Sequence, residues 1–354
     1  MSNRLSAMTA VHDTADKRGV PRTTGSRADH IERANLGCGT ITAVQTGSLA
    51  VRLFVAAGRI AARLPRIRGK TRLLLVLYRL AGLEHQHVPV RARLRRPVPF
   101  DVLLDLHSWL QRVAFLTGGY EEDTVEFLVD LHRRDGRGGT LLDVGANIGV
   151  ISIPFVRKSS ASAVAVEAVP DNVAVLRANI DLNGLHEKVQ VVPFALGATA
   201  GTAQIQVEGD LHAGEGTGTA NILPDQSTYE CVRQEIVVRT LDELVASGEL
   251  AARCSVVKID TDGYDLKVLQ GGTRFLERDR PVIFGEFSAH CLAWHDQTIG
   301  DVLAFAREQR YETWFRTPLT WDFTREAPVQ FDQDVLLVPA ESATTFASLL
   351  RRGT

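Results

Sequence analysis

Short apolar runs alternate with amphipathic segments along most of the chain. Apolar runs at 141–144, 163–167, 189–194, 256–260 and 282–286 have the length of buried strands. Apolar positions three and four residues apart predict intervening helices over 149–158, 171–183, 264–277 and 298–309. Closing strands are expected near 311–315 and 334–338. Because strands that alternate with helices form parallel sheets covered on both faces, we predict an α/β fold with a doubly wound, mostly parallel sheet.

Shorter patterns flank this core. A strand pair is expected at 88–94 and 100–105, followed by a helix over 125–134. Two further strands, 203–208 and 235–239, are joined by a Gly/Thr-rich stretch at 209–228. A connection of that length inside a domain is usually functional or disordered.

The first 85 residues have a different character. Residues 1–40 are polar with little periodicity, which predicts a disordered tail. Residues 41–85 predict a basic amphipathic helical segment, and residues 86–354 the α/β domain. Each of two helices in the segment has an apolar stripe; the stripes consist of Leu53, Ala57, Ile60 and Leu64, and of Leu73, Val76, Leu77 and Leu80.

Charge is distributed unevenly. The net charge is −2, but residues 33–82 contain nine Arg or Lys and no Asp or Glu. One interpretation is peripheral contact of residues 41–83 with anionic lipid at the inner face of the membrane. The other is packing on the α/β domain or in a homodimer, with solvated arginines. Both alternatives remain open.

Composition narrows the protein class. A content of 45% hydrophobic and 23% charged residues is that of an ordinary globular protein. The four cysteines are far apart and form no Cys-x-x-Cys pair, so a reducing compartment is expected. No apolar run approaches 18 residues, and no secretory signal is visible. We therefore expect a cytoplasmic protein with no global attraction to nucleic acid.

The first strong motif is the sequence Asp-Val-Gly-Ala-Asn-Ile-Gly at 143–149. Its glycines allow a tight turn and close approach of a ligand, and the following helix offers free N–H groups. Asn147 stands where a dinucleotide fingerprint needs glycine, and no Gly-Lys-Ser/Thr follows, which excludes a P-loop. Glu167, at the end of the next strand, is placed to bind the two hydroxyls of a ribose. The motif resembles the first motif of class I S-adenosylmethionine-dependent methyltransferases.

A second cluster, Asp-Thr-Asp-Gly-Tyr-Asp at 260–265, follows the strand ending at Ile259. Its carboxylates could cap the next helix or hold Mg²⁺ or Ca²⁺. The pattern is not an EF-hand loop, and a divalent metal is possible but not favoured.

The two motifs together carry a more specific resemblance. Residues 258–272, from Lys-Ile-Asp to Gly-Gly, are similar to the signature of FkbM-type methyltransferases. Further matches over 88–340 include Gly118 to Glu121, Glu167, Asn179, Ala195 to Gly197 and Thr240 to Asp242. Asp265 stands where the family usually has Glu, so its side chain is one methylene shorter.

The resemblance implies a Rossmann-like class I methyltransferase fold with an N-terminal helical extension. It also implies transfer of a methyl group from S-adenosylmethionine to an oxygen. Our candidates for cofactor binding are Asp143, Gly145, Asn147, Gly149, Glu167, Ala195 and Asp260. For the general base we rank Glu286, Asp262 and His290, and for substrate binding we choose Tyr120, Glu121, Asp265 and Trp294.

The predicted function is O-methylation of a saccharide, glycolipid or other secondary metabolite. Methyl transfer to nitrogen or carboxylate is the enzymatic alternative. A catalytically silent cofactor-binding module is the other alternative, although the strand-end carboxylates that such a module could lose are all present. A nucleic-acid methyltransferase would show an Asn/Asp-Pro-Pro-Tyr/Phe motif or a basic catalytic face, and neither is found in the sequence.

Overall fold

The structure is a computed structural model. It describes residues 48–64, 69–83, 87–208, 220–221, 231–317, 320–327 and 332–350. The predicted tail at 1–40 and nearly all of the stretch at 209–228 lie outside these residues. Among the described residues, no helix combines the length and the apolar character needed to cross a membrane.

An eight-stranded sheet forms the centre of the molecule, in the order β13-β12-β14-β11-β10-β3-β4-β5. The five strands from β11 to β5 run parallel, while β14, β12 and β13 pair antiparallel. The predicted doubly wound, mostly parallel sheet is therefore confirmed. The strands are β3 (Thr140–Val144), β4 (Ser162–Val166), β5 (Val189–Val192), β10 (Cys254–Ile259), β11 (Val282–Ser288), β12 (Tyr311–Arg316), β13 (Phe323–Thr324) and β14 (Asp332–Pro339).

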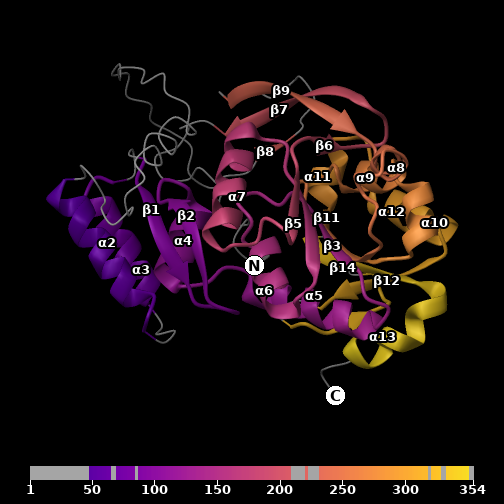
Figure 1. Ribbon diagram of the computed structural model, residues 1–354, viewed down its shortest axis with the longest axis horizontal. Helices are drawn as coiled ribbons and strands as arrows, with labels where there is room; N and C mark the ends of the chain where they lie inside the picture. The colour runs from indigo at the N-terminus through magenta and orange to yellow at the C-terminus, as the bar shows by residue number, and fades with distance from the viewer. Residues whose placement is uncertain are drawn as a thin grey trace.

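Alternate residues of the strands face two separate cores. Leu141 packs in a cluster with α5, α6, α7 and α13, whereas its neighbour Leu142 packs in a cluster with α8, α9, α10 and α12. Helices thus cover both faces of the sheet (Figure 1). The helices are α5 (Glu122–Asp135), α6 (Ser152–Ser159), α7 (Pro170–Leu182), α8 (Leu241–Ala246), α9 (Asp265–Gln270), α10 (Thr273–Asp279), α11 (Ala289–Ala293), α12 (Ile299–Glu308) and α13 (Ala343–Leu350).

The helix predicted over 264–277 is in fact two helices, α9 and α10. The break occurs at Gly271 and Gly272, where the chain passes very close to a neighbouring loop. A Cβ atom on Gly271 would lie 2.0 Å from the carbonyl oxygen of Gly197. This close packing overrides the helical periodicity. The short helix α11 and the C-terminal helix α13 were not predicted.

A second sheet, in the order β6-β9-β7-β8, is inserted after β5. The predicted strands at 203–208 and 235–239 correspond to β7 (Gly201–Glu208) and β9 (Cys231–Arg239), which pair antiparallel. β6 (Ala195–Leu196) and β8 (Ala220–Asn221) flank them.

The N-terminal elements form a layer at the left of Figure 1. It contains α2 (Leu49–Ala61), α3 (Lys70–Leu80), the predicted strand pair β1 (Pro89–Leu94) and β2 (Phe100–Asp105), and α4 (Trp109–Thr117), which was not predicted. The predicted apolar stripes of α2 and α3 face outward, except for Ala57, which is half-buried against the core. The residues that pack inward are Val51, Phe54, Val55, Leu74 and Tyr78.

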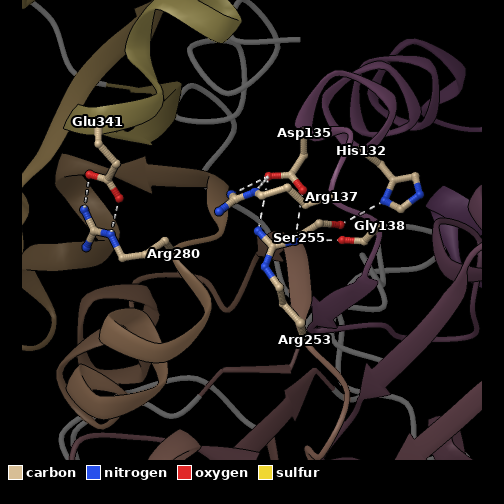
Figure 2. A network of polar contacts seen from close by, with 8 residues as sticks. All are labelled: His132, Asp135, Arg137, Gly138, Arg253, Ser255, Arg280 and Glu341. Atoms are coloured by element: carbon tan, nitrogen blue, oxygen red, sulfur yellow. Dashed lines mark hydrogen bonds and ion pairs between the residues drawn. The ribbon is translucent and has the colours of Figure 1, made fainter.

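Ion pairs close the edge of the sheet at which β3 and β10 begin (Figure 2). Asp135, at the end of α5, accepts hydrogen bonds from Arg137 at 2.6 Å and from Arg253 at 2.9 Å. Arg253 also donates to the carbonyl oxygen of Gly138, and His132 pairs with Ser255 at 2.8 Å. This network fixes the end of α5 to the starts of both strands.

We expect Asp135→Asn to lower the free energy of unfolding by roughly 1–3 kcal/mol at pH 7. Burial raises the pKa of Asp135, but hydrogen bonds from Arg253 and Arg137 outweigh it and hold the pKa below its usual value. The stabilisation is therefore complete above the unfolded pKa of about 3.9 and is lost as pH falls through the lower folded pKa. Urea denaturation at pH 7 and pH 3 measures this difference in the free energy of unfolding between the variant and the unaltered protein. Asp181→Asn, at an exposed position on α7, is the control, and an equal loss in both variants would contradict the assignment.

Candidate functional site

A cavity of about 320 Å³ opens where the parallel strands end. Its walls come from the turn after β3, the ends of β4, β10 and β11, and the helix α4. Ligands of open α/β sheets bind at this edge, and pockets of this size accept small molecules. Nine of the predicted site residues line the cavity: Tyr120, Glu121, Gly145, Asn147, Glu167, Ala195, Asp260, Asp262 and Glu286.

The turn after β3 provides one wall. Gly145 has φ 79°, and a Cβ atom there would lie 2.0 Å from the carbonyl oxygen of Asp260. Only glycine therefore allows β3 and β10 to end so close together. The helix α6 begins at Ser152, three residues later than predicted, because residues 147–151 form an additional turn. This turn presents backbone to the cavity.

Glu167 is hydrogen-bonded to this turn. One carboxylate oxygen accepts the N–H of Asn147 at 2.8 Å, and the other accepts the N–H of Val169 at 2.9 Å. Burial raises the pKa of Glu167, and these two hydrogen bonds lower it. The oxygen that accepts from Val169 also accepts from the Asn172 side-chain amide at 3.5 Å. A carboxylate has about four acceptor positions, so Glu167 can still accept from a hydroxyl group of a ligand.

Two predicted cofactor residues lie behind the turn instead of lining the cavity. Asp143 is fully buried; it accepts a hydrogen bond from the Ser152 hydroxyl at 2.5 Å and lies 3.7 Å from the Lys258 ammonium. Gly149 packs against α7, and a Cβ atom there would lie 2.8 Å from Leu176. In the structure, both residues support the turn.

Carboxylates form a second group in the cavity lining. Glu121, which directly precedes α5, lines the cavity together with Asp260 and Asp262 after β10 and Glu286 on β11. Lys258 lies among them, with its ammonium 3.1 Å from Asp260. Burial lowers the pKa of Lys258, but the charges of Asp260 and Asp143 outweigh burial and raise it above its usual value, so the side chain is a permanent cation.

Two of these acids titrate near neutral pH. Burial raises the pKa of Glu286 to about 8, helped by the charges of Asp260 and Asp334, although the side chain remains accessible to solvent in the cavity. Burial also raises the pKa of Glu121, partly offset by Lys258, to about 7. Proton acceptors with pKa values near the working pH suit general base catalysis.

The remaining predicted residues do not line the cavity. Asp265 is buried and accepts the N–H groups of Thr261 at 3.1 Å and Gly263 at 2.9 Å, which holds the turn after β10. His290 is exposed on α11 and contacts Trp294 edge-on, with ring centroids 5.0 Å apart. Neither His290 nor Trp294 belongs to the cavity wall.

Sequence reasoning missed several contributors. Lys258 was visible in the Lys-Ile-Asp motif but received no role. Asp334 comes from β14, pairs in register with Glu286 and forms an ion pair with Arg316 at 2.5 Å. Ser108, Gln111 and Ala114 come from α4 and the residue before it. No local signal relates these last residues to the motifs, because they reach the cavity only through the tertiary fold.

Comparison with known proteins identifies the family. Residues 143–313 match the model of the methyltransferase FkbM domain. The hexuronic acid methyltransferase AglP of Haloferax volcanii is 29% identical over 168 residues, which cover 47% of this chain and 61% of AglP. The ribosomal protein L11 methyltransferase of Geobacter metallireducens is 29% identical over 99 residues, or 28% of this chain and 31% of that protein.

Solved structures give weaker similarities. A methyltransferase FkbM from Methylobacillus flagellatus has a TM-score of 0.35 and 14% identity, with 81% of this chain and 59% of that chain covered. An O-methyltransferase from Bacillus cereus has a TM-score of 0.35 and 13% identity, with 81% and 99% covered. TM-scores this low carry no argument, so we assign the fold class from the strand order described above.

The family match includes both motifs. It begins at Asp143 and extends beyond Asp260 to Asp265 and Glu286. The chain spans less than two thirds of the length of AglP and of the Methylobacillus protein. The predicted resemblance is confirmed, since residues 143–313 match the methyltransferase FkbM domain.

Proposed function

We propose that this protein transfers a methyl group from S-adenosylmethionine to a hydroxyl group of a saccharide, glycolipid or other secondary metabolite. The observation that carries the proposal is the cavity itself. We call the glycine turn and Glu167 the first wall of the cavity, and Glu121, Asp260, Asp262 and Glu286 its acidic wall. The similarity to AglP, whose name records a hexuronic acid as its substrate, favours a sugar as acceptor.

The residues of the first wall fit S-adenosylmethionine. The backbone around Gly145 and Asn147 suits the methionine end, because no side chain can stand at Gly145. Glu167 suits the ribose, since its two oxygens are already fixed by backbone N–H groups. Ala195, at the start of β6, and its neighbour Phe194 give an apolar wall for the adenine.

S-adenosylmethionine supplies an electrophilic methyl group on a sulfonium. The protein therefore has to hold an acceptor oxygen in line with that methyl group and remove its proton. Glu286 is our first choice as base, because its side chain is accessible in the cavity. With S-adenosylmethionine bound, the Glu286 carboxylate would accept the proton of the acceptor hydroxyl as its oxygen takes the methyl group from the sulfonium. Asp262 and Glu121 lie in the same wall as alternative acceptors.

The carboxylates of the cavity are relevant to the alternative functions, which are methyl transfer to nitrogen or carboxylate and cofactor binding without catalysis. An alkyl amine is protonated at neutral pH and also needs a base, so the choice of oxygen over nitrogen rests on the similarity to AglP and not on these acids. The acidic wall disfavours a carboxylate as the methyl acceptor, because it would surround that group with like charges. In a hexuronic acid, which carries hydroxyl groups as well as a carboxylate, the proposed acceptor is therefore a hydroxyl group. A silent binding module has no need of acids with raised pKa values.

Calorimetric titration with S-adenosylhomocysteine tests the cofactor. We expect micromolar binding with and without EDTA, since the ligand contacts proposed here need no metal. Loss of binding in EDTA would instead assign a metal to the site. Absence of binding in a folded protein would refute the proposal.

Replacing Glu167 with Ala should weaken S-adenosylhomocysteine binding by roughly 1–3 kcal/mol, because the ribose hydroxyls lose their acceptor. The same titration measures the change. Glu187→Ala is the control, because the Glu187 side chain is 87% exposed. Equal affinity in the Glu167 variant and the unaltered protein would remove Glu167 from the site.

The pH dependence of turnover tests the base. With labelled S-adenosylmethionine and a panel of hexuronic acid glycosides, kcat/KM should rise with pH to a plateau above about 8, the pKa of Glu286. Glu286→Gln should remove this rise and lower turnover by ~10²–10⁴-fold, with little change in S-adenosylhomocysteine affinity. If Glu121→Gln removes the rise and Glu286→Gln does not, Glu121 is the base.

A further inference from the structure

The helices α2 and α3 expose large apolar side chains although they are packed on the domain. Leu53 is 61% exposed and Leu80 is 80% exposed. The other exposed apolar residues of this region are Leu49, Ile60, Leu64, Leu73, Val76 and Leu77. Among the described residues, this region contains eight of the nine exposed large apolar side chains; the ninth is Val237 on β9. We call this surface the α2–α3 face.

The opposite sides of both helices are firmly attached. The rings of Phe54 and Tyr78 contact each other at 5.2 Å, and the Tyr78 hydroxyl donates to the carbonyl oxygen of Leu106 at 3.1 Å. Gly58 lets α2 approach Phe115 of α4, since a Cβ atom there would lie 2.2 Å from that ring. The α2–α3 face is therefore the outer surface of a packed layer.

Exposed cations border this face. Arg52, Arg59 and Arg63 lie along α2 and just after it, and Arg72 and Arg79 lie on α3. The sequence has no Asp or Glu from residue 34 to residue 83. Apolar side chains next to basic ones, with no acid among them, complement a surface that is apolar below and anionic above.

We propose that the α2–α3 face binds the surface of an anionic lipid bilayer. Leucine and isoleucine side chains enter the boundary between headgroups and acyl chains, and the arginines bind lipid phosphates. A second copy of the chain fits less well. In a twofold dimer the same patch faces itself, so the arginines of both copies would meet without an acidic partner.

Sedimentation of the full chain with vesicles tests the proposal. The two probes are vesicles of phosphatidylcholine alone and vesicles of phosphatidylcholine with phosphatidylglycerol. We expect binding to the anionic vesicles that weakens as salt is raised. Arg52→Gln with Arg63→Gln should lower the partition coefficient by about 25-fold, at about fivefold for each arginine.

Leu53→Ser with Leu77→Ser should also reduce binding to the anionic vesicles, because it removes apolar side chains that enter the bilayer. The matched control is Val237→Ser with Arg177→Gln, which changes an exposed apolar residue and an exposed arginine elsewhere. It should bind as the unaltered protein does.

Three results would overturn the proposal. The first is no binding to either vesicle, and the second is equal binding by all variants. The third is a dimer in light scattering that Leu53→Ser with Leu77→Ser dissociates, without lipid binding, which would assign the face to a second copy. None of these readouts depends on methyl transfer, so the proposal stands or fails independently of the proposed function.

Discussion

The candidate site depends on a buried cation between two strands. Lys258 on β10 lies 3.7 Å from Asp143 on β3 and 3.1 Å from Asp260. Buried charges are tolerated only when they are paired, and removing one partner leaves the other uncompensated. The ammonium therefore holds Asp143 beneath the glycine turn and Asp260 at the cavity wall. Both the turn and the acidic wall would change without it.

The two ends of the parallel strands differ in their polar groups. At the edge where β3 and β10 begin, Asp135 and Arg253 belong to a network of ion pairs and hydrogen bonds that fixes α5 to these strands. At the edge where the strands end, polar groups line a cavity and several carboxylates have raised pKa values. The charged groups at the strand starts pair with one another, whereas the carboxylates at the strand ends line a cavity that a ligand can fill.

The helix α4 connects the N-terminal layer to this cavity. Its residue Ala114 lines the cavity, and the neighbouring Phe115 packs beneath Gly58 of α2. The helix α4 thus lies between α2 and the cavity and contacts both.

The sequence by itself determined the alternating strands and helices, the glycine turn and the acid at Glu167. These features have short-range causes, since apolar periodicity and glycine conformation act within a few residues. Only the tertiary structure decided the roles of two acids: Asp265 is buried as a support for the turn after β10, and Asp334 comes from β14 to lie in register with Glu286. The tertiary structure also decided which apolar side of α2 and α3 is buried. Phe54 and Tyr78 are buried and contact each other, whereas most of the predicted stripe residues are exposed.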